Sequence, residues 1–336
     1  GVEEPKSSET FGIGIRAIFA GAAGSRVGFG SEARDLSPDG IRRALEKARQ
    51  NTVLDPDFIS FPALPPDGNH RPRRSARYHD PAIMELHDGA LVEAGWRVLH
   101  DALKTFASSE ELARLAGSKE KLATMGLIVG GDVSLSQQRM AVASTRMPRV
   151  QTDESTAVTS YITSMVERKQ AKGSGYAAAT HLAKFKGEAG GEAARNAIKA
   201  ANGQRVSSGV YKVILGPQPV SDLVTNLILP SLSADAFYSC QSAFLGEFGR
   251  SVASDTLTIY DHGAAKGAVA SKQLTCEGLP TGRTDLIKEG MLRGLLSSHY
   301  ETHRLLRDPR AREKLGVNPQ EPIMGLAMLA ARGIAA

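Results

Sequence analysis

The chain has 336 residues, 41% hydrophobic and 23% charged, and its 41 basic and 36 acidic side chains give a formal charge of +5. This composition is typical of a globular protein of two domains, and so mild a charge does not establish nucleic-acid binding. No apolar run reaches the ~18 residues of a membrane-spanning helix, and two cysteines form neither a disulfide framework nor a cysteine zinc site. Because no signal-peptide pattern opens the chain, we expect a cytoplasmic protein without a membrane partner.

The first third predicts a strand followed by helices. Small and branched residues alternate over 11–19, which favours a strand. The glycines after it are interpreted as turn residues, with a hairpin as one possibility: Gly21, Gly24, Gly28 and Gly30. A Ser-Pro step at 37–38 and an Asp-Pro step at 80–81 each place an N-cap before a proline at the first helical position. They predict one helix after Ser37 and a long helix that ends near Phe106.

From residue 125 the pattern becomes β-rich, with turn residues between the segments, and predicts consecutive antiparallel strands. A loop is expected at 172–175 and a helix with a small-residue inner face at 188–201. Next come an expected strand over 210–215 and a helix over 220–229, ended by Pro230.

The last third predicts a strand over 256–260, a tight hairpin around Glu289-Gly290 and a helix over 298–307. The predicted strands follow one another along the sequence, and so do the predicted helices, instead of alternating. This order indicates an α+β fold with large antiparallel or mixed sheets and flanking helices. We expect two domains, an N-terminal α+β domain over 1–208 and a C-terminal β-rich domain over 209–336.

Histidine provides the one candidate for a metal site on a helix. His299 and His303 are four residues apart and can share a helical face. A zinc hydrolase also needs a glutamate beside the metal-bound water, and Glu301 points largely away from the pair at about 100° per residue. A solvated helix surface is therefore the favoured interpretation.

Other common site motifs are missing or weakly supported. The glycines of 12–30 lack the context of a phosphate-binding loop, and no G-x-S-x-G elbow is present. Cys276 has an adjacent acid but no nearby base in the sequence, and both Cys240 and Cys276 are interpreted as small buried or turn thiols. Residues 71–77 contain four arginines that could contact phosphate or an acidic peptide, although a solvated loop is the simpler interpretation.

Residues 274–283, L-T-C-E-G-L-P-T-G-R, combine one carboxylate, two glycines, a proline and an arginine in a specified turn. Composition alone leaves open whether this turn is structural or contacts a ligand. Its candidate contact residues are Glu277, Gly278 and Arg283.

An ordered set of segments resembles the TldD/PmbA family of peptide-maturation proteins. An early G-I-G-I-R strand resembles the "GvGvR" strand of that family, and further blocks follow in the family's order and spacing. These blocks are 209–217, 241–252, 257–261, 276–292 and 295–300. The resemblance covers most of residues 11–300, and its strength lies in the ordered set rather than in any one piece.

The resemblance implies a two-domain α+β fold and a dimer in which a zinc-bearing TldD-type subunit pairs with a TldE/PmbA-type subunit to trim peptides. The zinc-bearing type carries His-Glu-x-x-x-His in the helix that follows the strand matching 210–215. Here that helix, 219–230, has no histidine and no glutamate. The resemblance therefore implies a TldE/PmbA-like chain with no catalytic residue and no metal of its own. The expected partner is a TldD-type subunit that binds zinc, and the alternative is a homodimer of this chain. Glu277, Gly278 and Arg283 are expected to contact the peptide or the partner.

The chain departs from the family at Cys276, where the family has aspartate, and beyond Tyr300, where no Ser-Thr-Gly-Asn stretch is recognisable. It is also expected to be shortened at both ends. Two alternatives stay open: a DNA- or gyrase-associated regulatory protein, suggested by the family's earlier link to gyrase, and a divergent stand-alone hydrolase that uses His299 and His303. Nucleic acid is not the expected partner.

Overall fold

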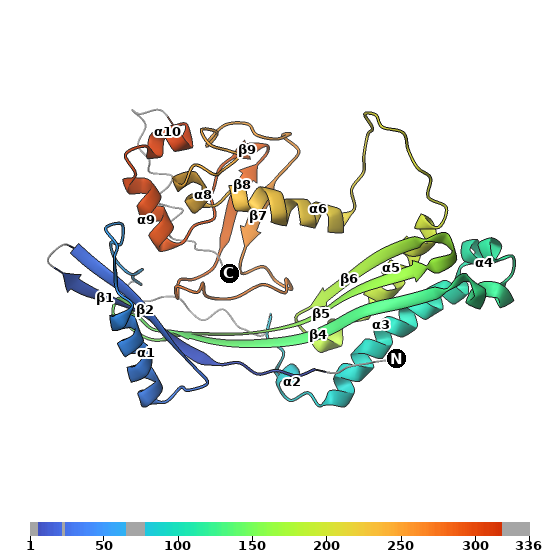
Figure 1. The fold of residues 1–336 in the computed structure, drawn as a ribbon, viewed down its shortest axis with the longest axis horizontal. Helices are drawn as coiled ribbons and strands as arrows, with labels where there is room; N and C mark the ends of the chain where they lie inside the picture. Colours follow the sequence, from blue (N-terminus) through green and yellow to red (C-terminus); the bar gives the residue numbers. More distant parts are fainter. Residues whose placement is uncertain (1–5, 22–23, 65–77, 318–336) are drawn as a thin grey trace.

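A computed structural model of the chain describes residues 6–21, 24–64 and 78–317. Within these residues the strands form three antiparallel sheets of three strands each, in the orders β1-β2-β3, β4-β5-β6 and β7-β8-β9. Helices pack against or between them, so the fold is α+β, with sheets smaller than expected. Figure 1 shows the C-terminal elements above the β4-β5-β6 sheet and helix α3 below it. None of the described helices is long and apolar enough to cross a bilayer.

The first unit is a hairpin covered by one helix. It comprises β1 (Gly12–Gly21), β2 (Gly24–Ala33), β3 (Val53–Leu54) and α1 (Pro38–Gln50). The predicted cap is confirmed, because the Ser37 side chain accepts a hydrogen bond from the Gly40 amide at 3.2 Å. The interpretation of Gly28 and Gly30 as turn residues is wrong. Both lie within β2, where a Cβ would overlap the α1 backbone, so they let the helix approach the sheet.

The predicted long helix begins later than expected. A short helix α2 (Pro81–Met84) follows the Asp80 cap, and α3 (Asp88–Ser108) starts after a break at 85–87. Helix α4 (Glu110–Ala116) and a 3-10 turn (Lys119–Met125) then lead into the central sheet. The Asp-Pro step therefore starts one helical turn, not the long helix.

The central sheet consists of β4 (Leu127–Val142), β5 (Gln151–Val166) and β6 (Ala171–Ala179), confirming the consecutive antiparallel strands. The loop expected at 172–175 is wrong, because those residues belong to β6. Gly173 and Gly175 lie under α5 (Glu188–Ala200), and a Cβ at either would overlap its backbone. Alanines line the facing side of α5, including the fully buried Ala189 and Ala193. Small residues on both elements thus permit a short distance between helix and sheet.

Residues 203–216, called the arm below, connect this unit to the C-terminal one. The strand expected at 210–215 is not observed, because no described residue pairs with the backbone there, and every arm residue is exposed. The arm continues into a helical segment formed by α6 (Pro217–Leu223), a π-helical turn (Val224–Ile228) and α7 (Leu229–Ser231).

The C-terminal unit gathers short elements around one apolar cluster. They are α8 (Ala234–Tyr238), β7 (Ile259–His262), β8 (Arg283–Lys288), β9 (Met291–Leu292), α9 (His299–Arg307) and α10 (Ala311–Leu315). Its core includes Phe237, Leu286 and Leu305. The hairpin turn is confirmed, since Glu289 and Gly290 have φ of 50° and 75°, as a two-residue turn with two left-handed positions requires.

Candidate functional site

The candidate site surrounds Glu277, where five segments distant in sequence meet. They are β1, the 55–64 segment, the loop between β4 and β5, the 274–281 loop and the first turn of α9. The charged and polar side chains around it include Arg16, Ser60, Arg146, His299 and His303. A meeting of segments from both halves of the chain is typical of a functional site rather than of a simple turn.

The 274–281 loop is fixed from inside by buried polar groups. The buried Thr275 hydroxyl accepts from the amides of Glu277 and Leu279, each at 3.2 Å. Buried Asp153 on β5 anchors the loop to the central sheet, because its carboxylate accepts from the Gln273 amide at 2.7 Å. The loop therefore holds Glu277 in one position instead of leaving it on a free turn.

Half-buried Glu277 faces the start of α9. Its carboxylate accepts from the His299 backbone amide at 3.0 Å, which satisfies one of the free amides at the helix N-terminus. Burial raises the pKa of Glu277; this hydrogen bond and the charge of Arg16 oppose the shift without cancelling it. The result is a carboxyl group that holds its proton to higher pH than an exposed glutamate does.

The two histidines of α9 lie side by side. Their ring centroids are 4.5 Å apart, and the His299 Nε2 is 3.5 Å from the Ser60 hydroxyl oxygen. Burial lowers the pKa of His299, and the neighbouring His303 and Arg146 lower it further, so its ring favours the neutral form. Glu301 does not join this pair, because its carboxylate accepts from the Ser298 amide in a capping box.

This geometry lacks the relay of a serine hydrolase. In such a relay a carboxylate would accept a hydrogen bond from the histidine ring, and the serine would lie within good hydrogen-bond distance of it. Here Glu277 contacts the His299 backbone, and the Ser60–His299 distance is at the outer limit. Among residues 6–21, 24–64 and 78–317, no group of three or more His, Cys, Asp or Glu could hold a metal ion.

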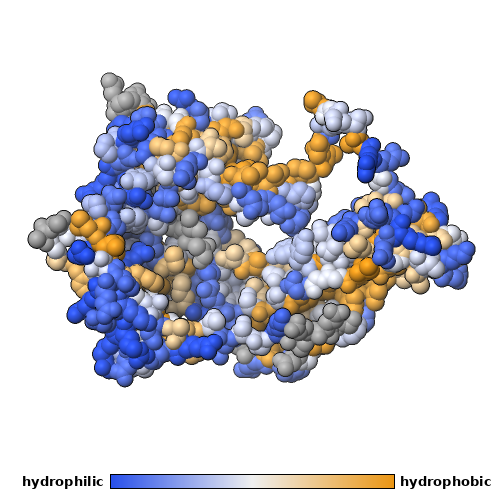
Figure 2. Space-filling view, in the orientation of Figure 1, coloured by the Kyte–Doolittle hydropathy of each residue, from blue (hydrophilic) through white to orange (hydrophobic). Residues whose placement is uncertain are grey.

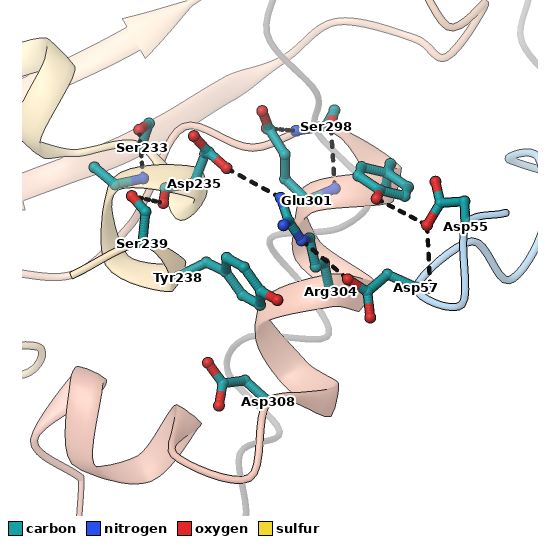
Figure 3. A network of polar contacts seen from close by, with 12 residues as sticks. Asp55, Asp57, Ser233, Asp235, Tyr238, Ser239, Ser298, Glu301, Arg304 and Asp308 are labelled. Atoms are coloured by element: carbon teal, nitrogen blue, oxygen red, sulfur yellow. Dashed lines mark hydrogen bonds and ion pairs between the residues drawn. The ribbon is translucent and has the colours of Figure 1, made fainter. Parts of the chain in front are cut away.

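Next to this site, Arg304 links the two halves of the molecule (Figure 3). Its guanidinium lies 3.1 Å from Asp57 and 3.5 Å from Asp235, and stacks 3.8 Å from the centre of the Tyr238 ring. The Tyr300 hydroxyl donates to Asp55 at 3.2 Å, so α9 is attached to the 55–64 segment at two points. These contacts hold α9, which carries His299 and His303, against the 55–64 segment.

The three predicted contact residues do not form one group. Glu277 and Gly278 share the loop tip, where Gly278 has a φ of 76° and lies against Met147. Arg283 lies on β8, where it pairs with Asp285 at 2.7 Å and stacks over Tyr260 at 3.9 Å. The four arginines of 71–77 lie outside the described residues.

The sequence interpretation missed Arg16, Ser60, Arg146 and Asp153 as parts of this site. Arg16 and Arg146 are exposed residues on unrelated segments, and no local motif connects either of them with Glu277. Chemically, the group offers a protonatable carboxyl on Glu277, the imidazole of His299, which favours the neutral form, beside that of His303, and two guanidiniums. These groups suit the recognition of a peptide backbone or a carboxylate end, and two of them have shifted pKa values, as functional sites often do.

Comparisons with known proteins match an N-terminal and a C-terminal part of the sequence. Residues 208–328 match the model of the PmbA/TldA metallopeptidase C-terminal domain, and residues 1–52 match PmbA/TldA metallopeptidase domain 1. An uncharacterized protein of Methanocaldococcus jannaschii is 31% identical over 114 residues, 33% of this chain and 26% of the relative. Metalloprotease PmbA of Escherichia coli O157:H7 is 26% identical over 116 residues, 34% of this chain and 26% of the relative.

Two solved structures share the fold. A Thermotoga maritima protein described as a putative modulator of a DNA gyrase superposes with a TM-score of 0.65 at 17% identity. The match covers 88% of this chain and 62% of the Thermotoga protein. TldE from Thermococcus kodakarensis superposes with a TM-score of 0.62 at 18% identity, and the match covers 90% of this chain and 64% of TldE. The chain thus spans less than two thirds of these structures, and its matches span about a quarter of the curated relatives.

Proposed function

The chain belongs to the PmbA/TldD metallopeptidase family, and we propose that it is the TldE/PmbA-type, non-metal subunit of a peptide-processing complex. In this proposal a TldD-type partner carries His-Glu-x-x-x-His and binds the zinc ion. This chain contributes surface that shapes the peptide site. It adds no zinc ligand and no catalytic group of its own.

One observation carries the proposal. The resemblance to the family places the zinc helix directly after residues 210–215, and here α6 and its π-helical continuation occupy that position. Their sequence, P-Q-P-V-S-D-L-V-T-N-L-I, offers one carboxylate, Asp222, and no imidazole. Two histidines and a water-activating glutamate cannot be assembled from this helix.

The site around Glu277 supports a peptide-contacting role. Strands β1 and β4 each pair on one side only among the described residues, and both reach this site. On β1 the charge of Arg16 lowers the pKa of Glu277, and on β4 Val142 lies beside Gly278. An extended peptide can add to such an edge through main-chain hydrogen bonds, while Glu277 and the arginines contact its polar groups.

The deciding experiment measures metal and cleavage together. The purified chain, a His-Glu-x-x-x-His-bearing relative from the same organism and their mixture would be analysed for zinc by mass spectrometry and for peptide cleavage. We expect zinc in the relative, cleavage only in the mixture, and co-purification of the two chains. Stoichiometric zinc together with cleavage by this chain alone would overturn the proposal.

The stand-alone hydrolase is tested in the same assay. A chain with His299→Ala and His303→Ala is expected to leave the zinc content of the mixture unchanged, because neither imidazole binds zinc in this proposal. Loss of zinc from the isolated chain on these substitutions would instead favour the hydrolase.

A further inference from the structure

Two arginines near the candidate site have no anionic partner in the chain. The charge of Arg16 acts on Glu277, and the charge of Arg146 acts on His299. Within the described residues, however, neither guanidinium forms an ion pair or a hydrogen bond. A guanidinium has five N–H donors in a rigid plane, so these two side chains offer a large unused capacity for hydrogen bonds.

Arg16 lies on the open face of the first hairpin. Its neighbours Ile15 and Ala17 pair with Gly30 and Gly28, the two glycines that lie under α1. Because successive side chains of a strand alternate between its faces, Arg16 points away from α1. Figure 1 shows α9 above this hairpin, seen along with the space-filling surface of the same view in Figure 2. The hairpin thus leaves this guanidinium uncovered, and its charge acts on the C-terminal half of the chain.

Arg146 lies in the loop between β4 and β5, where a turn fixes its backbone. Its amide donates to the Ser144 hydroxyl at 3.1 Å, and the Met147 amide donates to the Ser144 carbonyl at 3.0 Å. The Met147 side chain in turn lies against Gly278, at the tip of the 274–281 loop. Arg146 therefore belongs to a loop that packs on the candidate site, and its own side chain is exposed.

The carboxylates of α9 and of the 55–64 segment already have partners. Asp57 pairs with Arg304 at 3.1 Å. Asp55 accepts from the Tyr300 hydroxyl at 3.2 Å, and Glu301 accepts from the amide of its own N-cap at 2.8 Å. None of these three carboxylates pairs with Arg16 or Arg146, so the positive charge of the two arginines is not balanced from these elements.

Glu277 does not balance it either. Its carboxylate accepts from the His299 amide at 3.0 Å, and burial raises its pKa, so it holds its proton to higher pH than an exposed glutamate does. The backbone of the loop tip has no amide to offer an anion, since the amides of 277–279 all donate to Thr275. The guanidiniums are thus the donors that this site leaves unused, and they suit an anion brought by a ligand.

We infer that Arg16 and Arg146 together bind a carboxylate of the peptide substrate beside Glu277, an inference that rests on the proposed function. A carboxylate fits because a guanidinium can bind both of its oxygens through two parallel hydrogen bonds, and because it supplies the missing negative charge. The two arginines then select peptides that carry a carboxylate over neutral ones. The free C-terminus of a peptide and an acidic side chain share this chemistry, and the experiment separates these two sources.

The experiment compares three N-acetylated peptides of alternating alanine and glutamine, titrated into the full chain by calorimetry. The first is a neutral C-terminal amide, the second has a free C-terminal carboxylate, and the third is the amide with one internal glutamate. We expect at least one carboxylate peptide to bind ~10-fold or more tightly than the neutral amide, since hydrogen bonds to charged groups are among the strongest. The peptide that shows this preference identifies the source of the carboxylate.

Two double variants test whether these arginines cause the preference. Arg16→Gln with Arg146→Gln should reduce it to less than ~2-fold, whereas general damage to the fold would weaken neutral and charged peptides alike and leave the ratio unchanged. Arg97→Gln with Arg114→Gln, exposed on α3 and α4, removes the same charge elsewhere and should keep the full preference. Glu277→Gln removes a competing negative charge and should strengthen binding of the carboxylate peptide alone, by about 3-fold.

Three results would each overturn the inference: no binding or equal affinity for all three peptides, a preference that survives without Arg16 and Arg146, or a preference lost equally in the control variant. Zinc analysis and cleavage in the mixture decide the non-metal role and do not depend on this preference, so the two proposals can fail separately.

Discussion

Strand β5 and the arm contain similar side chains in opposite surroundings. Val158, Ile162 and Val166 on β5 are at most 5% exposed, whereas Val210 and Ile214 on the arm are 104% and 94% exposed. The strand is paired on both sides and covered by α5 on one face. The arm has an equally β-prone sequence, but no described strand pairs with it and no described helix covers it. β propensity therefore measures how well a residue fits a covered sheet, and it forms no strand where nothing covers the segment.

The largest test of this comparison changes the same residue type in both regions. Ile162→Ala removes a buried side chain from the central sheet and should cost about 2–5 kcal/mol of unfolding free energy. Ile214→Ala should change it by less than about 0.5 kcal/mol, because that side chain is 94% exposed. Urea unfolding measures both, and equal losses would show that the arm packs on its own chain.

A second test uses glycine. Gly175→Ala forces a Cβ into the backbone of α5 and should cost about 1–3 kcal/mol, because the helix must move away from the sheet. Gly216→Ala, at the end of the arm, meets no atom within 4 Å and has an ordinary negative φ, so it should leave the unfolding midpoint unchanged or raised. Thermal unfolding compares the two, and a tolerated Gly175→Ala would contradict the close helix–sheet contact.

A third test addresses the junction between the central sheet and the C-terminal half. Asp153→Ala removes the acceptor that holds the 274–281 loop and leaves buried amides unsatisfied, at a cost of about 2 kcal/mol. Asp153→Asn keeps one acceptor oxygen and should cost less. Hydrogen exchange should accelerate at the Gln273 and Leu274 amides in the alanine variant, and unchanged exchange would show that Asp153 does not anchor the loop.

The smallest expected effects depend on pH. The folded-state pKa of Glu277 is raised, so the folded chain binds this proton more tightly, and stability should fall as pH rises from about 4.3 towards that pKa. The folded-state pKa of His299 is lowered, so stability should fall as pH drops from about 6.5 towards it. Glu277→Gln should abolish the first slope and His299→Asn the second, as measured by unfolding midpoints between pH 4 and 7.5. Variants that keep both slopes would assign the titration to other groups.

Local signals predicted many of the element boundaries. The Ser37-Pro38 cap, the Glu289-Gly290 turn and the Ser298 start of α9 rest on hydrogen bonds within a few residues, and the structure contains all three. The failures at Gly28, Gly30, Gly173 and Gly175 share one cause. A glycine needed for a helix to approach a strand has the same sequence signal as a glycine in a turn.

The candidate site was predictable only in part. Residues 274–283 indicate a specified turn, and Glu277 is the one carboxylate in it, so the sequence alone indicated the residue at the centre of the candidate site. Its surroundings were not predictable, because the charge of Arg16 acts on Glu277, and Ser60 and Arg146 interact with His299, across sequence separations that no local pattern encodes.

The sequence by itself determined the family, the α+β class and a helix over 220–229 without histidine or glutamate, because these depend on residue order and local chemistry. Only the tertiary structure decided that 210–215 pairs with no strand among the described residues and that Glu277 faces the start of α9. Both depend on which distant segments reach a given surface, and burial between distant segments is a property of the folded chain rather than of any local pattern.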